Sequence, residues 1–208
     1  AVFNGIMSDA VASFGTVPTF WDNFDRGNGI IGVAPSGHAY QTVAVGGAKV
    51  TAYLSGGALV CDASGGTATA AYSAVDLGAI STRARARISF PSSGVSGIAA
   101  LISSKTFDAA NINYIVQDGS IHPVWTNATL SVSIYVGNVL TNLKTITYPT
   151  PMAMDGTIYE IGWDIDLATS TIWMIYPNGP RIAIQDSRIA QYAGRYVTYE
   201  HFANQQTG

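Results

Sequence analysis

Three carboxylates and a tryptophan occur close together near the end of the chain. Glu160, Asp164 and Asp166 alternate with apolar residues, and Trp173 follows a short turn later. Two carboxyl groups about 5–5.5 Å apart can cleave a glycosidic bond, one as acid and the other as nucleophile. A tryptophan beside carboxylates can instead hold a pyranose ring, because the indole supplies contact area and the carboxylates accept hydroxyl protons. This segment is therefore a candidate for glycan cleavage or glycan binding.

Three arginines form a second group with regular spacing. Arg83, Arg85 and Arg87 alternate with small or apolar residues, which places their guanidinium groups on one face of a strand. Like charges on one side of a strand repel, so acidic neighbours are expected. Because Glu160 and Asp164 lie on a strand with the same two-residue period, we predict that the two strands are near neighbours with interleaved charges. The functional alternative is a site for an acidic polysaccharide or a phosphate-bearing envelope polymer, with Arg85 in contact with the ligand.

A third candidate surrounds the dipeptide at residues 118–119. Asp-Gly between alternating runs indicates a two-residue hairpin, because a type I′ turn needs positive φ at both positions. If Gln117 pairs with Ser120, Asn113 and His122 share the open face of this hairpin. An amide and an imidazole there could hydrogen-bond sugar hydroxyls, although solvated sheet faces carry the same residue types.

The elements around Trp173 are predicted as a second hairpin. Pairing Asp166 with Thr171 across a four-residue loop places Trp173 opposite Asp164 on the outer face. Asn178-Gly179 indicates another two-residue turn of type I′, and the strand after it is expected to put Ile182 and Ile184 beside Ile175 and Trp173. Such a face is either a ligand site or a subunit interface.

The whole sequence has the pattern of an all-β protein. No window sustains a helical period for three turns, whereas short alternating or β-branched runs recur between turn signals. We expect an antiparallel β-sandwich of two stacked sheets with almost no helix. Tyr114, Trp125 and Trp163 are predicted to face its core. The expected strands are 40–45, 48–54, 57–62, 67–72, 83–90, 96–103, 111–117, 120–126, 130–136, 139–147, 157–166, 171–176, 181–186 and 195–202.

Residues 22–32 and 36–41 have the pattern D-x-F-x-R-x-x-G-x-x-G followed by G-x-x-aromatic-Q. This pattern resembles the opening of the concanavalin A-like, or laminin-G-like, jelly-roll domains of bacteriophage virion proteins, notably minor tail proteins. The resemblance runs from about Asp22 to about Phe202. It implies one lectin-like jelly roll over residues 21–208, preceded by an N-terminal arm or edge segment at residues 1–20.

The resemblance also implies a function. It indicates a virion structural protein of the minor tail or appendage type, made in the host cytoplasm and carried on the particle surface. Such a protein packs with other virion proteins and as a homo-oligomer, for which we expect three copies, and its lectin-like domain binds host envelope polysaccharide. The alternatives are a glycan-degrading hydrolase of the same fold and a capsid decoration protein without a ligand.

Catalysis is not supported by a complete set of residues. The laminarinase-like glucanases of this fold class use a Glu-x-Asp-x-(x)-Glu strand, but Gly162 stands where the central Asp would be and no second Glu follows. No residue is therefore assigned a catalytic role. Members of the family often hold a structural calcium ion, for which Asp22, Asn23 and Asp25 are candidate ligands. These side chains equally suit turn capping, so no metal site and no cofactor are assigned.

Composition excludes some partners. Charged residues make up 11% of the chain, against about 25% in ordinary soluble domains. Such a weakly charged surface suits a protein covered by partner chains, and it equally suits an exported or high-GC-genome protein rich in small residues. The net charge of −3 argues against a nucleic-acid partner, since phosphate binding needs clustered Lys and Arg. Cys61 is the only cysteine, so no intrachain disulfide can form. No apolar run approaches the roughly 20 residues of a spanning helix, so no membrane insertion is expected.

Overall fold

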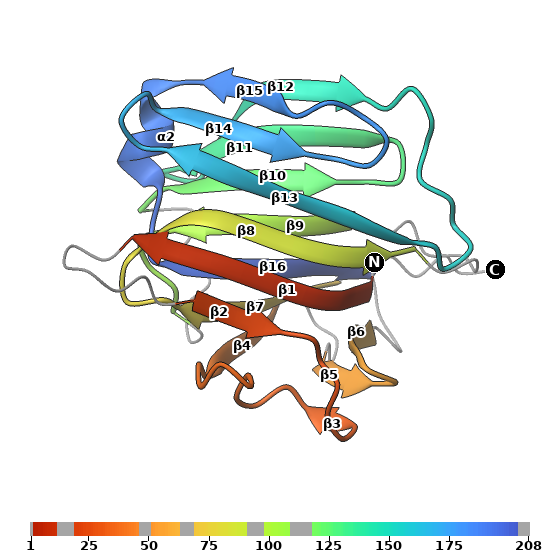
Figure 1. The fold of residues 1–208 in the computed structure, drawn as a ribbon. Helices are drawn as coiled ribbons and strands as arrows, with labels where there is room; N and C mark the ends of the chain where they lie inside the picture. The colour runs from red at the N-terminus through yellow and green to blue at the C-terminus, as the bar shows by residue number, and fades with distance from the viewer. Residues whose placement is uncertain are drawn as a thin grey trace.

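The computed structural model describes residues 2–11, 19–45, 51–62, 69–90, 98–108 and 118–203. Within these ranges almost all regular structure is β-strand, and every strand pairing is antiparallel. Two sheets stack face to face, and the nine-stranded sheet lies in front in Figure 1. The chain therefore forms an antiparallel all-β sandwich of the jelly-roll type, with two stacked sheets and almost no helix, as the sequence predicts.

The nine-stranded sheet carries most of the charged candidates. Across the sheet its strands are β15 (Ile182–Gln185), β14 (Thr171–Ile175), β13 (Ile158–Asp166), β8 (Ile80–Ser89), β1 (Val2–Val11), β6 (Ala58–Asp62), β5 (Thr51–Ser55) and β3 (Gly29–Ile30). The remaining strand, β2 (Thr19–Asp22), also pairs with β1.

The seven-stranded sheet lies behind. In order it contains β12 (Val139–Thr147), β11 (Thr129–Val136), β10 (Ser120–Trp125), β9 (Ile98–Ser104), β16 (Tyr196–Ala203), β7 (Thr69–Asp76) and β4 (Tyr40–Val45). The short helix α2 (Ser187–Tyr192) connects β15 to β16 at one end of the sandwich (Figure 1).

Two buried indoles join the sheets across the core. Trp125 projects from the seven-stranded sheet, and its Nε1 donates to the carbonyl of Ile175 in the other sheet at 3.1 Å. Trp163 projects from the nine-stranded sheet, and its Nε1 donates to the carbonyl of Leu101 at 2.9 Å. Both side chains are fully buried, which confirms their predicted core positions. Each indole thus adds a hydrogen bond to the apolar contact between the layers.

The N-terminal segment differs from the sequence interpretation. Residues 1–20 were expected to form an arm or an edge segment, but residues 2–11 form β1, which pairs with β8 on one side and with β2 and β6 on the other. β1 is therefore an interior strand of the sheet. It is rich in Asn, Gly, Ser and Asp, which are uncommon in strands, so its sequence hides its role.

The predicted turns have mixed outcomes. Asp166 pairs with Thr171, which confirms the loop at residues 167–170. Residues 176–181 also connect two paired strands, but only Asn178 has a positive φ, so the turn is not the predicted two-residue type I′ turn. Residues 111–117 lie outside the described ranges, and with them Tyr114. Ser120 pairs with Ser104 and Tyr135 on its two sides, so the predicted pairing with Gln117 is wrong.

Candidate ligand-binding site

The opening motif, at residues 22–32, contains a hydrogen-bond network around the buried Asp22 that fixes its own loop. The side chain of Asp22 accepts hydrogen bonds from the amide of Phe24 at 2.7 Å, from Arg26 at 2.6 Å and from the hydroxyl of Tyr40 at 2.9 Å. Arg26 also donates to the carbonyl of Ile31 at 2.7 Å. Burial and the neighbouring Asp22 raise the pKa of Tyr40, so its hydroxyl stays a donor. The motif at residues 22–32 therefore stabilises the fold, with Arg26 joining Asp22 to the carbonyl of Ile31.

The arginine strand and the carboxylate strand are direct neighbours. β8 and β13 pair antiparallel, with Arg87 opposite Glu160 and Arg83 opposite Asp164. Because directly opposite residues of an antiparallel pair project to the same side, the basic and acidic side chains share the outer face of the sheet. Their adjacency, predicted from matching spacing, is confirmed.

Asp164 is the centre of this face. Its carboxylate accepts from Nε of Arg83 at 2.9 Å and from Nη2 of Arg85, which lies 2.7 Å from both oxygens. Arg181, which lies just before β15, forms a third ion pair with it. Arg85 is the most buried of the three arginines and also donates to the carbonyls of Ala84 and Trp163, at 2.8 and 2.7 Å. Arg85 therefore fixes Asp164, while Arg83 and Arg181 are 49% and 51% exposed.

These carboxylates do not form a hydrolytic pair. Both oxygens of Asp164 are held by guanidinium groups, so neither faces a leaving group that it could protonate. Asp166 turns to its own loop, where the hydroxyl of Thr169 donates to it at 2.7 Å and lowers its pKa. Glu160 lies at the opposite end of the strand and is exposed. The geometry suits recognition through hydrogen bonds and charge.

Trp173 stands beside this charged cluster and is 42% exposed. It pairs with Asp164 on one side, as predicted, and with Ala183 on the other. The expectation that Ile182 and Ile184 flank it is wrong, because they lie opposite Met174 and Ile172 and face the core. A small neighbour thus leaves the indole open to solvent.

A second exposed tryptophan, which sequence reasoning missed, shares this outer face. Trp21 on β2 is 46% exposed and pairs with Met7 of β1, which in turn pairs with Arg85. The register therefore places Trp21 on the same side as Arg85. The available signal was the alternation of Trp21 with its buried neighbours Phe20 and Asp22.

His122 belongs to the other sheet and does not join this site. Its Nε2 lies 2.8 Å from Oε2 of Glu200, a buried side chain of β16. His122 is itself mostly buried, so its predicted place on an open face is wrong. Burial and Glu200 also raise the pKa of Tyr72, which lies opposite Glu200. Asn113 lies outside the described residues.

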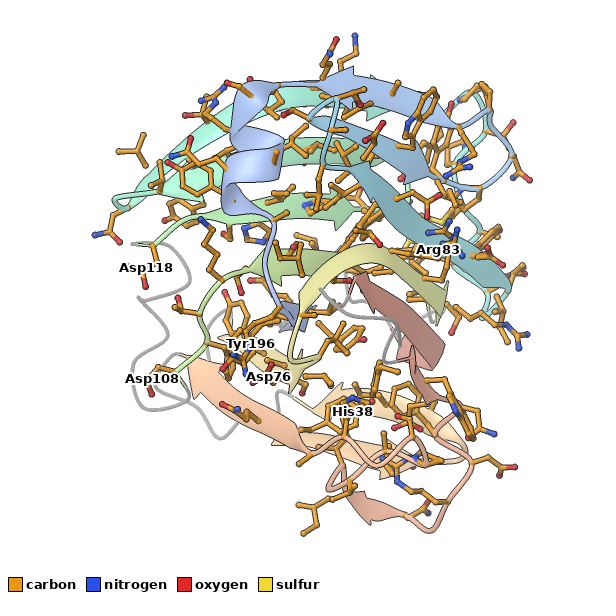
Figure 2. All side chains as sticks on the ribbon, turned by 60° about the vertical axis from the view of Figure 1, so that its left-hand side comes forward. His38, Asp76, Arg83, Asp108, Asp118 and Tyr196 are labelled. Carbon is orange, nitrogen blue, oxygen red and sulfur yellow. The ribbon has the colours of Figure 1, made fainter. Side chains whose placement is uncertain are left out.

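Buried polar atoms accompany this second cluster. Among the described residues, no hydrogen-bond partner is found for Oγ of Ser120, Nδ1 of His122 or Oγ1 of Thr198. All three project from the face of the seven-stranded sheet that carries Glu200. Figure 2 shows Arg83 well apart from Asp76 and Tyr196, which also belong to the seven-stranded sheet. The two clusters are separate candidates on opposite layers.

In the part of the chain that the structure describes, no three His, Cys, Asp or Glu side chains gather closely enough to hold a metal ion. Nor does any helix in that part have the length and apolar character needed to cross a membrane. The calcium ligation proposed for Asp22, Asn23 and Asp25 stays a prediction.

The comparisons with known proteins concern the fold and not the function. No protein-family model and no curated protein matches the chain. Among solved structures it is similar to lectin II from Ulex europaeus, at 12% identity over 87% of this chain and 90% of that one, with a TM-score of 0.46. The carbohydrate-binding module CBM66 from Bacillus subtilis matches at 12% identity over 65% and 83%, with a TM-score of 0.45. LamA from Z. galactanivorans, solved with laminaritriose and laminaritetraose, matches at 12% identity over 75% and 71%, with a TM-score of 0.41.

Proposed function

We propose that this chain is a lectin-like domain that binds glycans with the outer face of its nine-stranded sheet. The observation that carries the proposal is the exposed indole of Trp173 beside the cluster of Asp164, Arg83 and Arg181. An exposed indole offers a flat apolar surface for the face of a sugar ring. The half-exposed guanidinium groups next to it donate hydrogen bonds to hydroxyl or acidic oxygens.

The site is also rigid, which favours binding. Trp173 sits in a strand that is paired on both sides, and Asp164 is fixed by Arg85, which is itself bonded to two backbone carbonyls. A site held in its bound geometry loses less conformational entropy when a ligand arrives. Flexible loops are not needed to form it.

The biological setting that we propose is the surface of a bacteriophage particle. The domain would act as a minor tail or appendage protein, packed with other virion proteins and with copies of itself, and would contact host cell-surface polysaccharide. Support comes from the opening motif and from the sparse charge of 11%, which lowers the cost of covering the surface with partner chains. Native mass spectrometry tests the expected trimer, which has three times the chain mass of 21.8 kDa.

A glycan array with matched variants tests the proposed binding. Trp173→Ala removes the platform, and Leu140→Ala, an exposed apolar residue of β12 in the other sheet, is the control. Binding that is lost only in Trp173→Ala supports the proposal. Equal binding by both variants overturns the proposed site, and an array without any signal favours the decoration protein. New reducing ends after incubation with cell-wall polysaccharide would favour the hydrolase.

A further inference from the structure

The two exposed tryptophans lie on the same face of one continuous sheet. Trp173 projects from β14 and Trp21 from β2, with β13, β8 and β1 between them. Four strand spacings of about 4.8 Å put the two indoles roughly 19 Å apart across the strands. Each of these strands is hydrogen-bonded to the next, so the separation is fixed. A ligand that contacts both indoles is therefore an extended chain, because a disaccharide is too short to span them.

The surface between the indoles is low along the row of Trp21. On β8 and β13 this row contains Arg85 and Gly162, which lie directly opposite each other. Gly162 has no side chain. The side chain of Arg85 is only 16% exposed, because it folds onto Asp164 and two backbone carbonyls. Neither β8 nor β13 therefore raises a side chain of this row into the path of a chain that crosses the sheet.

The charges along the row of Trp173 alternate in sign. Asp164, Arg83 and Asp9 occupy this row on three neighbouring strands. Arg83 forms an ion pair with Asp164, and Asp9 occupies the position directly opposite Arg83 on its other side. Opposite charges at directly opposite positions attract, whereas like charges there repel. The row therefore presents no stretch of one sign that would attract a charged ligand.

Other arginines of this face also lie beside acidic residues. Arg85 and Arg181 both form ion pairs with Asp164, and Arg87 lies opposite Glu160. An acidic ligand has to compete with these carboxylates, so it exchanges one ion pair for another and gains little. The net charge of −3 adds no long-range attraction for it. Hydroxyl groups, in contrast, can bind at paired charges without separating them, because each carboxylate oxygen accepts more than one hydrogen bond.

We infer that the ligand is an uncharged polysaccharide that lies across the strands from Trp173 to Trp21. Its sugar rings pack on the two indoles, and its hydroxyl groups hydrogen-bond to the paired charges between them. The inference rests on the proposed function and adds the charge class, the minimum length and the path of the ligand. A second copy of this chain that packed on the same indoles would instead make the native mass depend on them.

Matched polymers test the charge class. The pairs are hydroxyethyl cellulose with carboxymethyl cellulose, dextran with dextran sulfate, and methyl-esterified with free polygalacturonate. Each pair keeps the backbone and changes the charge. We expect a neutral member to bind and its charged counterpart to bind no more tightly. Because no net charge is exchanged, the affinity for the neutral polymer should change less than about twofold between low and high salt.

The outcomes separate the two failures. Tighter binding of the charged members, affinity that falls steeply with salt, or glycan-array signals confined to acidic glycans overturn the inference and leave the proposed function standing. Signals from neutral glycans longer than a disaccharide support the inference. The absence of binding to any glycan, charged or neutral, overturns the proposed function and the inference together.

Trp21→Ala tests the path. Oligosaccharides of increasing length, cut from the neutral glycan that binds, are titrated into the wild-type protein and the variant. In the wild type the affinity should rise about tenfold once the chain reaches both indoles, the gain expected from one stacked ring. Trp21→Ala should lose this gain and bind short oligosaccharides as the wild type does. Leu140→Ala, an exposed change on the other sheet, should behave as the wild type at every length.

The indole N–H signal of Trp21 gives a second test that does not depend on the stability of Trp21→Ala. It should shift when the long oligosaccharide is added and stay in place when the disaccharide is added. Equal loss of affinity in Trp21→Ala for short and long chains, or no loss for either, overturns the crossing path. A native mass that falls in Trp21→Ala places a second copy on this face and overturns the inference as well.

Discussion

Asp164 forms ion pairs with three guanidinium groups, and Asp164→Asn tests how much these pairs stabilise the fold. In Asp164→Asn the guanidinium groups of Arg83, Arg85 and Arg181 each lose their ion pair with the carboxylate of Asp164. Because Asp164 is only 20% exposed, we expect a loss of about 1–3 kcal/mol in the free energy of unfolding. Urea denaturation measures it. Asp25→Asn, in an exposed loop, is the control, and equal stability of the two variants would contradict the structural role of Asp164.

Gly162 allows the two charged strands to approach closely. A Cβ at this position would lie 2.3 Å from the carbonyl oxygen of Ala84 and 2.8 Å from Cδ of Arg85. Gly162→Ala should therefore displace Arg85 and cost about 1–3 kcal/mol of stability, as overpacking does elsewhere. Gly27→Ala, where a Cβ meets nothing within 4 Å, should change the melting temperature little. A stable Gly162→Ala variant would show that the strands can separate without loss.

Some residues of the site can be predicted from the sequence, and others cannot. Asp164, Arg85 and Trp173 were found because local alternation and a short hairpin fix their faces. Glu160 lies on the same face but at its edge. The partner of His122 could not be found, because Glu200 is 78 residues away and only the order of strands brings the two together. Asn113 lies outside the described residues and stays a prediction.

At the scale of elements, strands with local signals were located well and β1 was not. Strand β4 at residues 40–45 and β12 at residues 139–147 match their predicted ranges. β1 contains few β-branched residues, and its place between β8 and β2 comes from pairing with distant segments, which no local pattern reveals. The helix α2 was also missed, because its six residues are too few for a helical period to be visible.

The N-cap of α2 offers a test with a defined pH dependence. Asp186 accepts from the amide of Arg188 at 3.0 Å and from its guanidinium group at 2.8 Å. Asp186→Ala should lower the free energy of unfolding by about 0.5–2 kcal/mol, the usual value of an N-cap. Gln191→Ala, an exposed change in the same helix, is the control, measured by the same denaturation.

The sign of the pH effect follows from the pKa. The side chain of Arg188 lowers the pKa of Asp186 from 3.8 to about 2. The extra stability of the charged form is therefore complete above pH 3.8 and is lost as the pH falls through 2. The difference between wild type and Asp186→Ala should shrink over this window in acid denaturation. A difference that grows on acidification would contradict the assignment.

At the scale of the molecule, the tryptophans of the core and those of the outer face differ in their surroundings. In the core, the indoles of Trp125 and Trp163 each donate a hydrogen bond to a backbone carbonyl of the opposite sheet. The outer face of the nine-stranded sheet exposes Trp21 and Trp173 around the arginines. The same residue type thus stabilises the core at two positions and is free to contact a ligand at the other two.

This division makes the four tryptophans direct reporters of the ligand face. The indole N–H signals of the protein labelled with nitrogen-15 can be assigned by replacing each tryptophan with phenylalanine and followed while a glycan that binds is added. The account predicts that the signal of Trp173 shifts with saturating behaviour while those of the buried Trp125 and Trp163 stay in place. A glycan that saturates the protein without moving the Trp173 signal would contradict the assignment of the binding face.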